Sequence, residues 1–278
     1  MTANVPSIEL NSGTTIPQVG FGVFQVPPPE TTQAVQNALD AGYRHIDTAR
    51  IYDNEEAVGQ AIKDSGIDRD DLFITTKLWN SDQGYDETLA AFDASMQRLG
   101  LDVLDLYLIH WPTPAQDKYV DTWRAFEKLQ SDGRIKAIGV SNFQISHLKR
   151  LAEETDIVPA VNQIELHPWL AQTELRDYHS SHGIVTEAWS PLARGGDFLK
   201  NETLGEIAAK HDRTPAQVML RWHIQLGNVV IPRTVNADRA VQNISLFDFE
   251  LDADDIAAIA TLDAGTRIGP DPDDFNVA

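Results

Sequence analysis

The chain alternates short apolar runs with longer amphipathic segments along most of its 278 residues. The apolar runs, for example VLDLYLIHW at 103–111 and IKAIGVSN at 135–142, are nearly continuous, as parallel strands covered on both faces are. A small hairpin is expected over 7–17, with its turn at Asn11–Gly13, and eight strand–helix units follow it. This order predicts an α/β fold, a (β/α)8 TIM barrel, and a doubly wound sheet is the alternative.

Helical spacing and turn signals place the helices between these runs. Asn54 and Glu55 are interpreted as the capped start of one of them. No linker or low-complexity tract divides the chain, so we expect a single domain over 1–278, with extra helices at its C-terminal end. The predicted helices cover about 31–41, 54–64, 86–99, 119–131, 145–155, 173–182, 202–211 and 215–226, a segment from about 238, and 253–262.

The composition excludes several classes of function. There are no cysteines, which excludes disulfides, thiol catalysis and cysteine-based zinc sites. The net charge of −20 makes binding to nucleic acid or to anionic membranes unfavourable. No signal peptide is visible, and no apolar run approaches the ~20 residues of a membrane span. We therefore expect a cytoplasmic monomer that binds neither nucleic acid nor membrane.

Ionisable residues end three successive predicted strands. RHID ends at Asp47, LFITTK at Lys77 and LDLYLIH at His110, and the loop after the first strand brings Tyr52 to the same edge. Each residue alone has an ordinary explanation. Asp47 could cap a helix, and Lys77 could be a strand-end cation facing water. His110 could be a core histidine, and Tyr52 could be a packing residue. The carboxyl ends of barrel strands carry the chemistry, and a buried lysine needs an anion nearby. Because three successive strands end in an ionisable residue, a functional site at this edge is favoured over the ordinary explanations.

This group of side chains suits proton donation to a carbonyl oxygen. An ordinary tyrosine titrates near ~10, and a nearby ammonium stabilises its phenolate. We therefore expect Lys77, held by Asp47, to lower the pKa of Tyr52 and make it a general acid. His110 would orient the carbonyl oxygen and share its developing charge. The hydride must come from a cofactor, because no side chain supplies one.

The second half of the chain suggests where a cofactor binds. GFGVFQ at 20–25 is not a dinucleotide fingerprint, because Gln25 stands where the third glycine belongs. Ser141, Asn142 and Gln163 can hydrogen-bond a carboxamide. Trp189 offers a flat ring for stacking. After the eighth strand, near a predicted helix N-terminus, comes a grouping that suits a phosphate in an otherwise acidic molecule: Arg233, Thr234 and Arg239.

Seven motifs together resemble the aldo-keto reductase family over essentially the whole chain. They are GYRHIDTARIYDNE, TTKLWN, LYLIHWP, IGVSNF, VNQIELHP, SPLARG and IPRTVNADRAVQN, and they occur at strand ends in the order of the family. In detail the chain is most similar to bacterial 2,5-diketo-D-gluconic acid reductases. The resemblance implies NADPH-dependent, metal-independent reduction of aldehydes and ketones to alcohols. Aromatic pocket walls and a short C-terminal tail would admit keto-sugars, small dicarbonyls, keto esters or aryl aldehydes.

The resemblance also implies roles for residues of this chain. Tyr52 would be the general acid, tuned by Lys77 and Asp47, and His110 would orient the carbonyl. The implied walls of the substrate pocket are Phe24, Trp79 and Trp111. The implied cofactor contacts, with the 2′-phosphate at Arg233, Thr234 and Arg239, are Gly22, Val23, Ser141, Asn142, Gln163, Trp189, Ser190, Leu192, Arg233, Thr234, Val235, Arg239, Gln242 and Asn243.

The chain departs from the family at the phosphate position, where Arg233–Thr234 replaces the usual Lys–Ser. Arginine still binds phosphate, so NADP(H) is expected. In the family this region closes the substrate pocket, so the resemblance implies that the short acidic tail RIGPDPDDFNVA at 267–278 leaves an open, permissive substrate site. Two other functions stay open, a non-catalytic NADP(H)-binding regulatory module and an enzyme in which Lys77 forms a Schiff base. No metal site is expected, because Glu165–His167 lacks a second histidine at ligand spacing.

Overall fold

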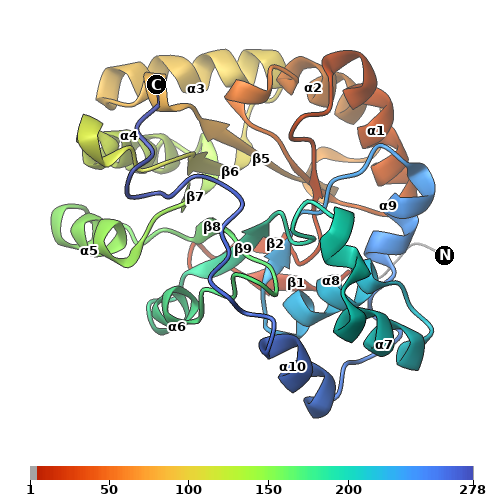
Figure 1. Cartoon of the computed structure of the whole chain (residues 1–278). Coiled ribbons are helices and arrows are strands. Elements are labelled where there is room, and N and C mark those ends of the chain that lie inside the picture. The colour runs from red at the N-terminus through yellow and green to blue at the C-terminus, as the bar shows by residue number, and fades with distance from the viewer. Residues whose placement is uncertain (1–4, 278) are drawn as a thin grey trace.

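The computed structural model describes residues 5–277, in which helices surround a barrel of parallel strands (Figure 1). The strands are β1 (Ser7–Glu9), β2 (Thr15–Pro17), β3 (Phe21–Gly22), β4 (His45–Asp47), β5 (Phe73–Leu78), β6 (Leu104–Ile109), β7 (Ile135–Ser141), β8 (Val161–Glu165), β9 (Val185–Trp189) and β10 (Val229–Val230). The helices are α1 (Pro28–Ala41), α2 (Glu55–Asp64), α3 (Tyr85–Leu99), α4 (Tyr119–Ser131), α5 (Ile145–Glu154), α6 (Thr173–Ser181), α7 (Glu202–His211), α8 (Pro215–Gln225), α9 (Ala237–Ile244) and α10 (Ala253–Ala260). None of the helices in this described range is long and apolar enough to cross a membrane.

The eight strands β3 to β10 lie in sequence order in one sheet, and its two end strands also meet. Val19 bridges Val230 in parallel. The N–H of Gly20 donates to the carbonyl oxygen of Val230 at 2.8 Å, and the N–H of Val230 donates to that of Gln18 at 3.0 Å. The sheet is therefore a closed barrel. This confirms the (β/α)8 prediction and excludes the doubly wound alternative.

The N-terminal hairpin closes one end of the barrel. Its strands β1 and β2 pair antiparallel, as predicted. Ile16 and Leu10 are buried in one apolar cluster with side chains from the barrel strands. Those strand residues include Leu106, Val161 and Val229, the last two of which begin β8 and β10. The amino ends of the strands are therefore sealed by apolar side chains, and the polar carboxyl ends form the opposite rim.

Local capping signals explain where the later helices begin. The side chain of Thr214 accepts from the backbone N–H of Gln217, and the Gln217 side chain accepts from that of Thr214, which starts α8 with Pro215 at its first position. Asp252 and Asp255 make the same reciprocal cap at α10. α10 lies beyond the eighth strand–helix unit and is one of the predicted extra helices.

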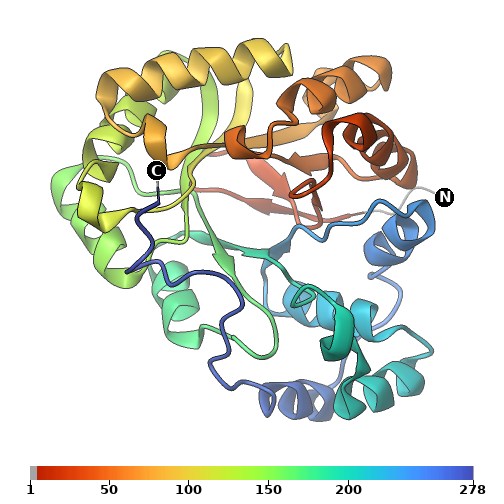
Figure 2. The same ribbon diagram turned by 45° about the horizontal axis from the view of Figure 1, so that its top comes forward.

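The C-terminal tail runs from α10 across the rim towards the side of α3 and α4 (Figure 2). Asn80, just after β5, donates through Nδ2 to the carbonyl oxygen of Val277 at 2.7 Å. The ring of Phe275 packs against that of Trp111, with centroids 4.5 Å apart. The tail thus covers part of the rim, and the openness of the substrate site stays a prediction.

Candidate active site

Three successive strands bring an acid, a base and an imidazole to the same rim. Asp47 ends β4, Lys77 lies near the end of β5, and His110 directly follows β6. Lys77 Nζ donates to Asp47 Oδ1 at 2.6 Å and to the carbonyl oxygen of Thr48 at 2.9 Å. Lys77 and Asp47 are both buried. The lysine therefore has the carboxylate partner that a buried ammonium requires.

Tyr52 completes this group. It ends a short 3-10 turn, η1 (Arg50–Tyr52), that follows β4. Lys77 Nζ lies 5.2 Å from the centroid of its ring. The ring centroid of His110 is 5.8 Å from that of Tyr52, and the centroid of Phe24 is 5.1 Å from it. The structure thus brings together all four residues predicted to be catalytic, which we call the catalytic cluster: Asp47, Tyr52, Lys77 and His110.

Asn54 holds the loop that carries Tyr52. Its Nδ2 donates to the carbonyl oxygens of Val23 at 3.0 Å and Val26 at 3.2 Å. Its Oδ1 accepts from Thr48 Oγ1 at 2.7 Å. Asn54 is the N-cap residue of α2, as the sequence predicted, but its side chain makes no capping hydrogen bond to the helix. It joins the loop after β4 to the loop after β3, and this fixes the point from which Tyr52 reaches the rim.

Glu55 has a larger structural role than its predicted place at the start of a helix. It is buried, and its carboxylate accepts from Thr76 Oγ1 at 2.6 Å and Ser95 Oγ at 3.3 Å. It also accepts from Arg98 Nε at 2.6 Å. A carboxylate in the first turn of α2 is favoured by the helix dipole as well. Glu55 therefore ties α2 to β5 and α3, directly behind the loop of Tyr52.

Burial decides the protonation of the phenol and the imidazole. It raises the pKa of Tyr52 above the usual 10.0; Lys77 lowers this pKa and Asp47 raises it again, so the net shift is upward. The predicted net lowering is therefore wrong, although Lys77 acts in the expected direction. Burial, reinforced by the charge of Lys77, holds the pKa of His110 well below 6.5. At neutral pH, Tyr52 keeps its proton and His110 is uncharged.

Lys77 is a cation in this environment. Burial would lower its pKa, but the charge of Asp47 raises it, and the hydrogen bond between them acts in the same direction, so the pKa lies above 10.5. A protonated ammonium has no lone pair with which to attack a carbonyl carbon. This argues against the Schiff-base alternative and for a role in stabilising negative charge on Tyr52.

Another buried carboxyl group, Glu187, lies one layer below the rim. It sits in β9 directly opposite Gln163 of β8. Gln163 Nε2 donates to Glu187 Oε2 at 2.8 Å and to Asp47 Oδ2 at 2.9 Å. Burial raises the pKa of Glu187 to about 8, and the nearby Asp47 charge adds to the effect. Sequence reasoning missed Glu187, and the only available signal was one acid inside the apolar run VTEAW.

The raised pKa of Glu187 makes stability depend on pH. A carboxyl with a pKa of about 8 when folded and near 4.5 when unfolded binds more protons in the folded state. The contribution of Glu187 to the free energy of unfolding therefore falls as pH rises from about 5 to about 8. We expect the unfolding temperature of the wild type, measured relative to that of Glu187→Gln, to fall over this range. Identical pH profiles would contradict the assignment.

Ser141 and Asn142 join the ends of neighbouring strands. Ser141 Oγ donates to the carbonyl oxygen of Gln163 at 2.8 Å. Asn142 Nδ2 donates to the carbonyl oxygen of His110 and to Ser141 Oγ, both at 3.0 Å. Asn142 Oδ1 accepts from Trp189 Nε1 at 2.7 Å, which fixes the indole at the end of β9. Their contacts with a carboxamide stay a prediction.

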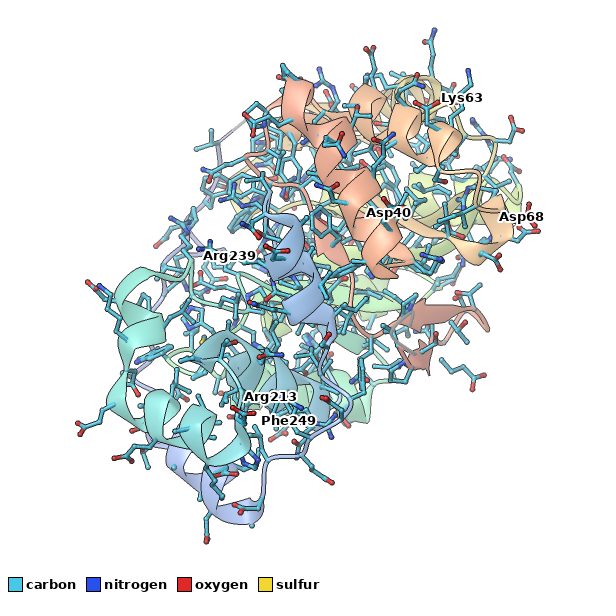
Figure 3. The ribbon with its side chains drawn as sticks, turned by 90° about the vertical axis from the view of Figure 1, so that its right-hand side faces the viewer. Asp40, Lys63, Asp68, Arg213, Arg239 and Phe249 are labelled. Carbon is cyan, nitrogen blue, oxygen red and sulfur yellow. The ribbon has the colours of Figure 1, made fainter. Side chains whose placement is uncertain are left out.

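The predicted phosphate residues follow β10. Arg233 is exposed, and its Nη1 donates to the carbonyl oxygen of Phe24 at 3.0 Å. Thr234 Oγ1 accepts from the backbone N–H of Asn236 at 3.1 Å. Arg239 is exposed on the first turn of α9, where its backbone N–H donates to Asn236 Oδ1 at 2.9 Å (Figure 3). Two exposed arginines therefore flank the start of α9.

The other predicted cofactor residues lie at the end of β3, in the segments after β3, β9 and β10, and in α9, and these three strands are neighbours in the closed barrel. The N–H of Gly22 donates to the carbonyl oxygen of Pro232 at 3.2 Å. A Cβ at Gly22 would lie 3.0 Å from the carbonyl oxygen of Ile231, so the two chain segments approach closely there. The remaining members are Val23 and Asn243, which are buried, Ser190 and Leu192, which are partly buried, and Val235 and Gln242, which are exposed.

Aromatic side chains border the catalytic cluster. Phe24 is 47% exposed beside it. The ring centroid of Trp79, just after β5, is 5.3 Å from that of His110. Trp111 is buried against Phe275 of the tail. All three predicted wall residues therefore lie at the rim, and Phe275 is an additional aromatic residue that sequence reasoning did not single out.

Glu165 and His167 anchor the tail. The Glu165 carboxylate accepts from the backbone N–H of Ile268 at 2.6 Å, from that of Gly269 at 2.9 Å and from His167 Nε2 at 3.1 Å. Burial would raise the pKa of Glu165, but these hydrogen bonds lower it overall. A Cβ at Gly269 would lie 2.5 Å from the Trp189 ring, so a larger residue would displace the tail or the indole.

A sequence profile identifies the family to which this barrel belongs. The profile of the Aldo/keto reductase family matches residues 18–264, a range that contains all eight barrel strands and the catalytic cluster.

The chain belongs to the aldo/keto reductase family.

The resemblance predicted from the seven motifs is thereby confirmed. This aldo-keto reductase is 54% identical over 270 residues to the glyoxal reductase of Bacillus subtilis, with 97% of each chain covered. It is 49% identical over 274 residues to the methylglyoxal reductase DkgA of Salmonella typhimurium, covering 98% of this chain and 99% of the relative. It also resembles the solved structure of a Gox0644 mutant in complex with NADPH, at 50% identity, 98% coverage of each chain and a TM-score of 0.93.

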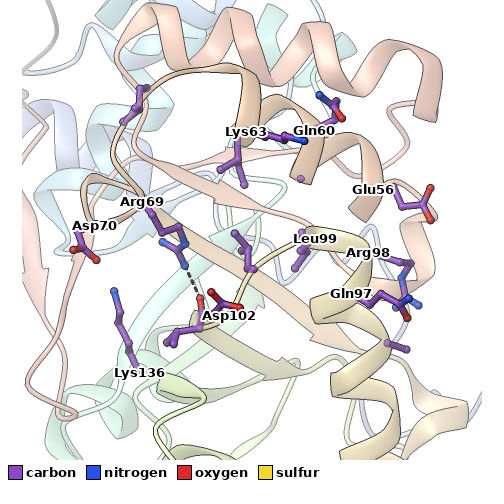
Figure 4. Close-up of a pocket in the computed structure, with 17 residues that line it drawn as sticks. Glu56, Gln60, Lys63, Arg69, Asp70, Gln97, Arg98, Leu99, Asp102 and Lys136 are labelled. Carbon is purple, nitrogen blue, oxygen red and sulfur yellow. Dashed lines mark hydrogen bonds between the residues drawn. The ribbon is translucent and has the colours of Figure 1, made fainter.

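A groove of about 1030 Å³ lies at the other end of the aldo-keto reductase barrel (Figure 4). Residues of α2 and α3 and of the loops that precede β5 and β6 line it, so it is remote from the catalytic cluster. Three of its basic side chains, Arg69, Arg98 and Lys136, are paired within the protein, and Lys63 is exposed at its edge. Arg69 and Lys136 both contact Asp105, and Arg98 pairs with Glu55. Because three of these four positive charges are already neutralised, the rim remains the candidate active site.

Proposed function

We propose that this aldo-keto reductase reduces small neutral dicarbonyl compounds, such as glyoxal, to alcohols, with NADPH as cofactor and Tyr52 as general acid. The observation that carries the proposal is the buried Lys77 ammonium, held by Asp47 and 5.2 Å from the centroid of the Tyr52 ring. A buried ion pair contributes little net stability, because desolvation offsets its attraction. Its place beside a phenol at the barrel rim therefore favours a catalytic role.

The catalytic cluster can donate a proton to a carbonyl oxygen. Tyr52 is protonated at neutral pH, because burial raises its pKa. As negative charge develops on the carbonyl oxygen, the phenol transfers its proton to that oxygen, and Lys77 stabilises the phenolate that remains. His110, neutral in this environment, can donate a hydrogen bond to the same oxygen. The hydride for the carbonyl carbon is what NADPH supplies when bound.

The residues at the rim fit NADPH. Arg233 and Arg239 place exposed positive charge at the start of α9 in a molecule of net charge −20, which suits a 2′-phosphate. The indole of Trp189 is partly exposed and held in place by Asn142, which suits stacking on a planar ring. Gln163, between the cluster and β9, suits the carboxamide. The NADPH complex of the 50% identical Gox0644 protein supports the same cofactor.

The tail favours neutral substrates over anionic ones. Asp271, Asp273 and Asp274 are exposed on the segment between Gly269, which packs at Trp189, and Phe275, which packs on Trp111. Charges of like sign at such a rim repel an anionic substrate over the Debye length, about 8 Å at physiological salt. The relatives named glyoxal reductase and methylglyoxal reductase support small dicarbonyl substrates.

The proposal is tested by following NADPH absorbance with purified protein in the presence of EDTA. We expect turnover of glyoxal and methylglyoxal, and a kcat/KM for glyoxylate at least about tenfold lower, because its carboxylate meets the acidic tail. Glyoxal and glyoxylate form a matched pair that differs in charge. Failure to oxidise NADPH with any aldehyde would favour the regulatory module, whereas equal use of glyoxal and glyoxylate would remove only the preference for neutral substrates.

Arg233→Ala is expected to weaken NADPH binding by about 10- to 100-fold, because a hydrogen bond to a charged group contributes about 1.5–3 kcal/mol. NADH, which lacks the 2′-phosphate, should bind to this variant with nearly wild-type affinity. Dissociation constants from fluorescence titration measure both effects. Arg124→Ala is the matched control, because Arg124 pairs with Asp121 on α4, away from this site. An unchanged ratio of NADPH to NADH affinity in Arg233→Ala would remove the phosphate role.

A further inference from the structure

We propose that Glu187 is a positioning residue that fixes the side-chain amide of Gln163, so that the amide oxygen is presented to the carboxamide of the cofactor. The inference rests on the proposed function, because it takes Gln163 as a carboxamide contact. It concerns the pair of opposed residues in β8 and β9, one layer below the rim. Glu187 itself would not touch the cofactor.

The hydrogen bonds of Gln163 define which of its atoms is available. Its Nε2 has two hydrogens, and they are donated to Asp47 Oδ2 at 2.9 Å and to Glu187 Oε2 at 2.8 Å. Within residues 5–277, no donor is hydrogen-bonded to its Oε1. Both donors are thus satisfied inside the barrel, and the acceptor is left for a ligand. A carboxamide N–H is the matching donor.

Two acceptors are needed to hold the amide in one plane. Asp47 has its other oxygen on Lys77, so it remains an acceptor whatever happens to Glu187. A glutamine held by Asp47 alone could still rotate about that single hydrogen bond, and its oxygen would have no fixed direction. The second bond, to Glu187, removes this rotation. The direction of the Gln163 oxygen is therefore set jointly by Asp47 and Glu187.

Packing does not explain a carboxyl group at position 187. Its Oε1 is buried and has no hydrogen-bond partner among the described residues. The ionisable groups that face it are Asp47, Lys77, Tyr52 and His45, and the Nε2 of His45 is 3.7 Å from Glu187 Oε1. His45 is neutral, because burial lowers its pKa to about 3. A buried oxygen without a partner lowers stability, so the bond to Gln163 is the contact that accounts for this residue.

The test measures binding rather than turnover, with two variants of Glu187. Glu187→Met keeps the length of the side chain and removes the acceptor, and Glu187→Gln keeps an acceptor. We expect Glu187→Met to bind NADPH about tenfold more weakly, the loss of one ordinary hydrogen bond. It should bind 2′,5′-ADP, which has no nicotinamide, as the wild type does. Glu187→Gln should bind both compounds within about twofold of the wild type.

The proposal is overturned if Glu187→Met binds NADPH as tightly as the wild type, if 2′,5′-ADP binding weakens equally, or if Glu187→Gln loses as much as Glu187→Met. Gln163→Met separates this inference from the proposed function. If Gln163→Met leaves the ratio of NADPH to 2′,5′-ADP affinity unchanged, the carboxamide contact itself is wrong. If Gln163→Met changes that ratio and Glu187→Met does not, only the role of Glu187 fails. Glu187→Leu replaces Glu187→Met should the latter not fold.

Discussion

Tyr52→Phe is expected to lower kcat/KM for glyoxal by about 100- to 10,000-fold, the usual contribution of a general acid. The substitution removes the proton that the cluster donates and keeps the ring, which packs against Phe24 and His110. The dissociation constant for NADPH should therefore stay within about twofold of the wild type, since no cofactor contact is removed. Steady-state kinetics and fluorescence titration measure the two quantities separately.

Tyr85→Phe is the matched control for this result. Tyr85 is 40% exposed at the start of α3, outside the catalytic cluster, and its hydroxyl has no part in the proposed reaction. It should keep wild-type activity. A Tyr52→Phe variant with more than about a tenth of wild-type kcat/KM would show that another group donates the proton, and the general-acid assignment would then be abandoned.

Lys77→Met should both unfold more easily and fail to reduce carbonyls. Methionine fills a similar length but leaves the Asp47 carboxylate buried without its cation, which costs about 3–5 kcal/mol of unfolding free energy. Activity is lost as well, because the phenolate of Tyr52 is no longer stabilised. Urea denaturation at neutral pH measures the stability change. Lys128→Met, which removes an exposed pair with Asp132, should change stability by less than about 1 kcal/mol.

A double variant separates the two effects of Lys77. Asp47→Asn combined with Lys77→Met removes both charges, so it should recover part of the lost stability, about 1 kcal/mol or more. It should recover no activity, because the ammonium is still missing. If Lys77→Met alone lowers the free energy of unfolding by less than about 1 kcal/mol, Lys77 and Asp47 are not both charged in the folded protein. If the double variant regains activity, Lys77 has no role in catalysis.

The sequence predicted the rim residues well because barrel topology converts a position in the chain into a position in space. Asp47, Lys77 and His110 each stand where an apolar run ends, and parallel strands place all such ends on one rim. The hairpin and the helices were also predictable, because their signals are local: turn residues, helical spacing and caps such as Thr214. Local sequence information was sufficient wherever the position of a residue depends on a single strand or helix.

Residues whose role depends on distant partners could not be predicted. Glu187 meets Gln163, 24 positions earlier, and through it Asp47, which is 116 positions from Gln163. Glu55 begins α2 as predicted, but its contact with Arg98, 43 positions away, is not visible in the sequence. Each of these contacts joins separate strands or helices, so no local pattern encodes it.

The direction of the Tyr52 pKa shift and the path of the tail were beyond sequence reasoning for the same physical reason. The pKa depends on how far burial outweighs the attraction of Lys77, and this balance is set by distances in the folded barrel. The length and acidity of the tail were visible, but its anchoring by Glu165 was not. The composition of the tail predicts its negative charge. It does not predict that the tail packs on Trp111.

The seam that closes the barrel has a consequence for stability. Its strands, β3 and β10, have only two residues each, and the side chain of Arg233 crosses it to reach Phe24. The predicted cofactor contacts lie on both sides of this seam. A dinucleotide bound there would contact both β3 and β10, the shortest strands of the barrel, and would stabilise their pairing. NADPH would then also suppress local opening of the fold. The temperature of thermal unfolding should therefore rise with the concentration of NADPH.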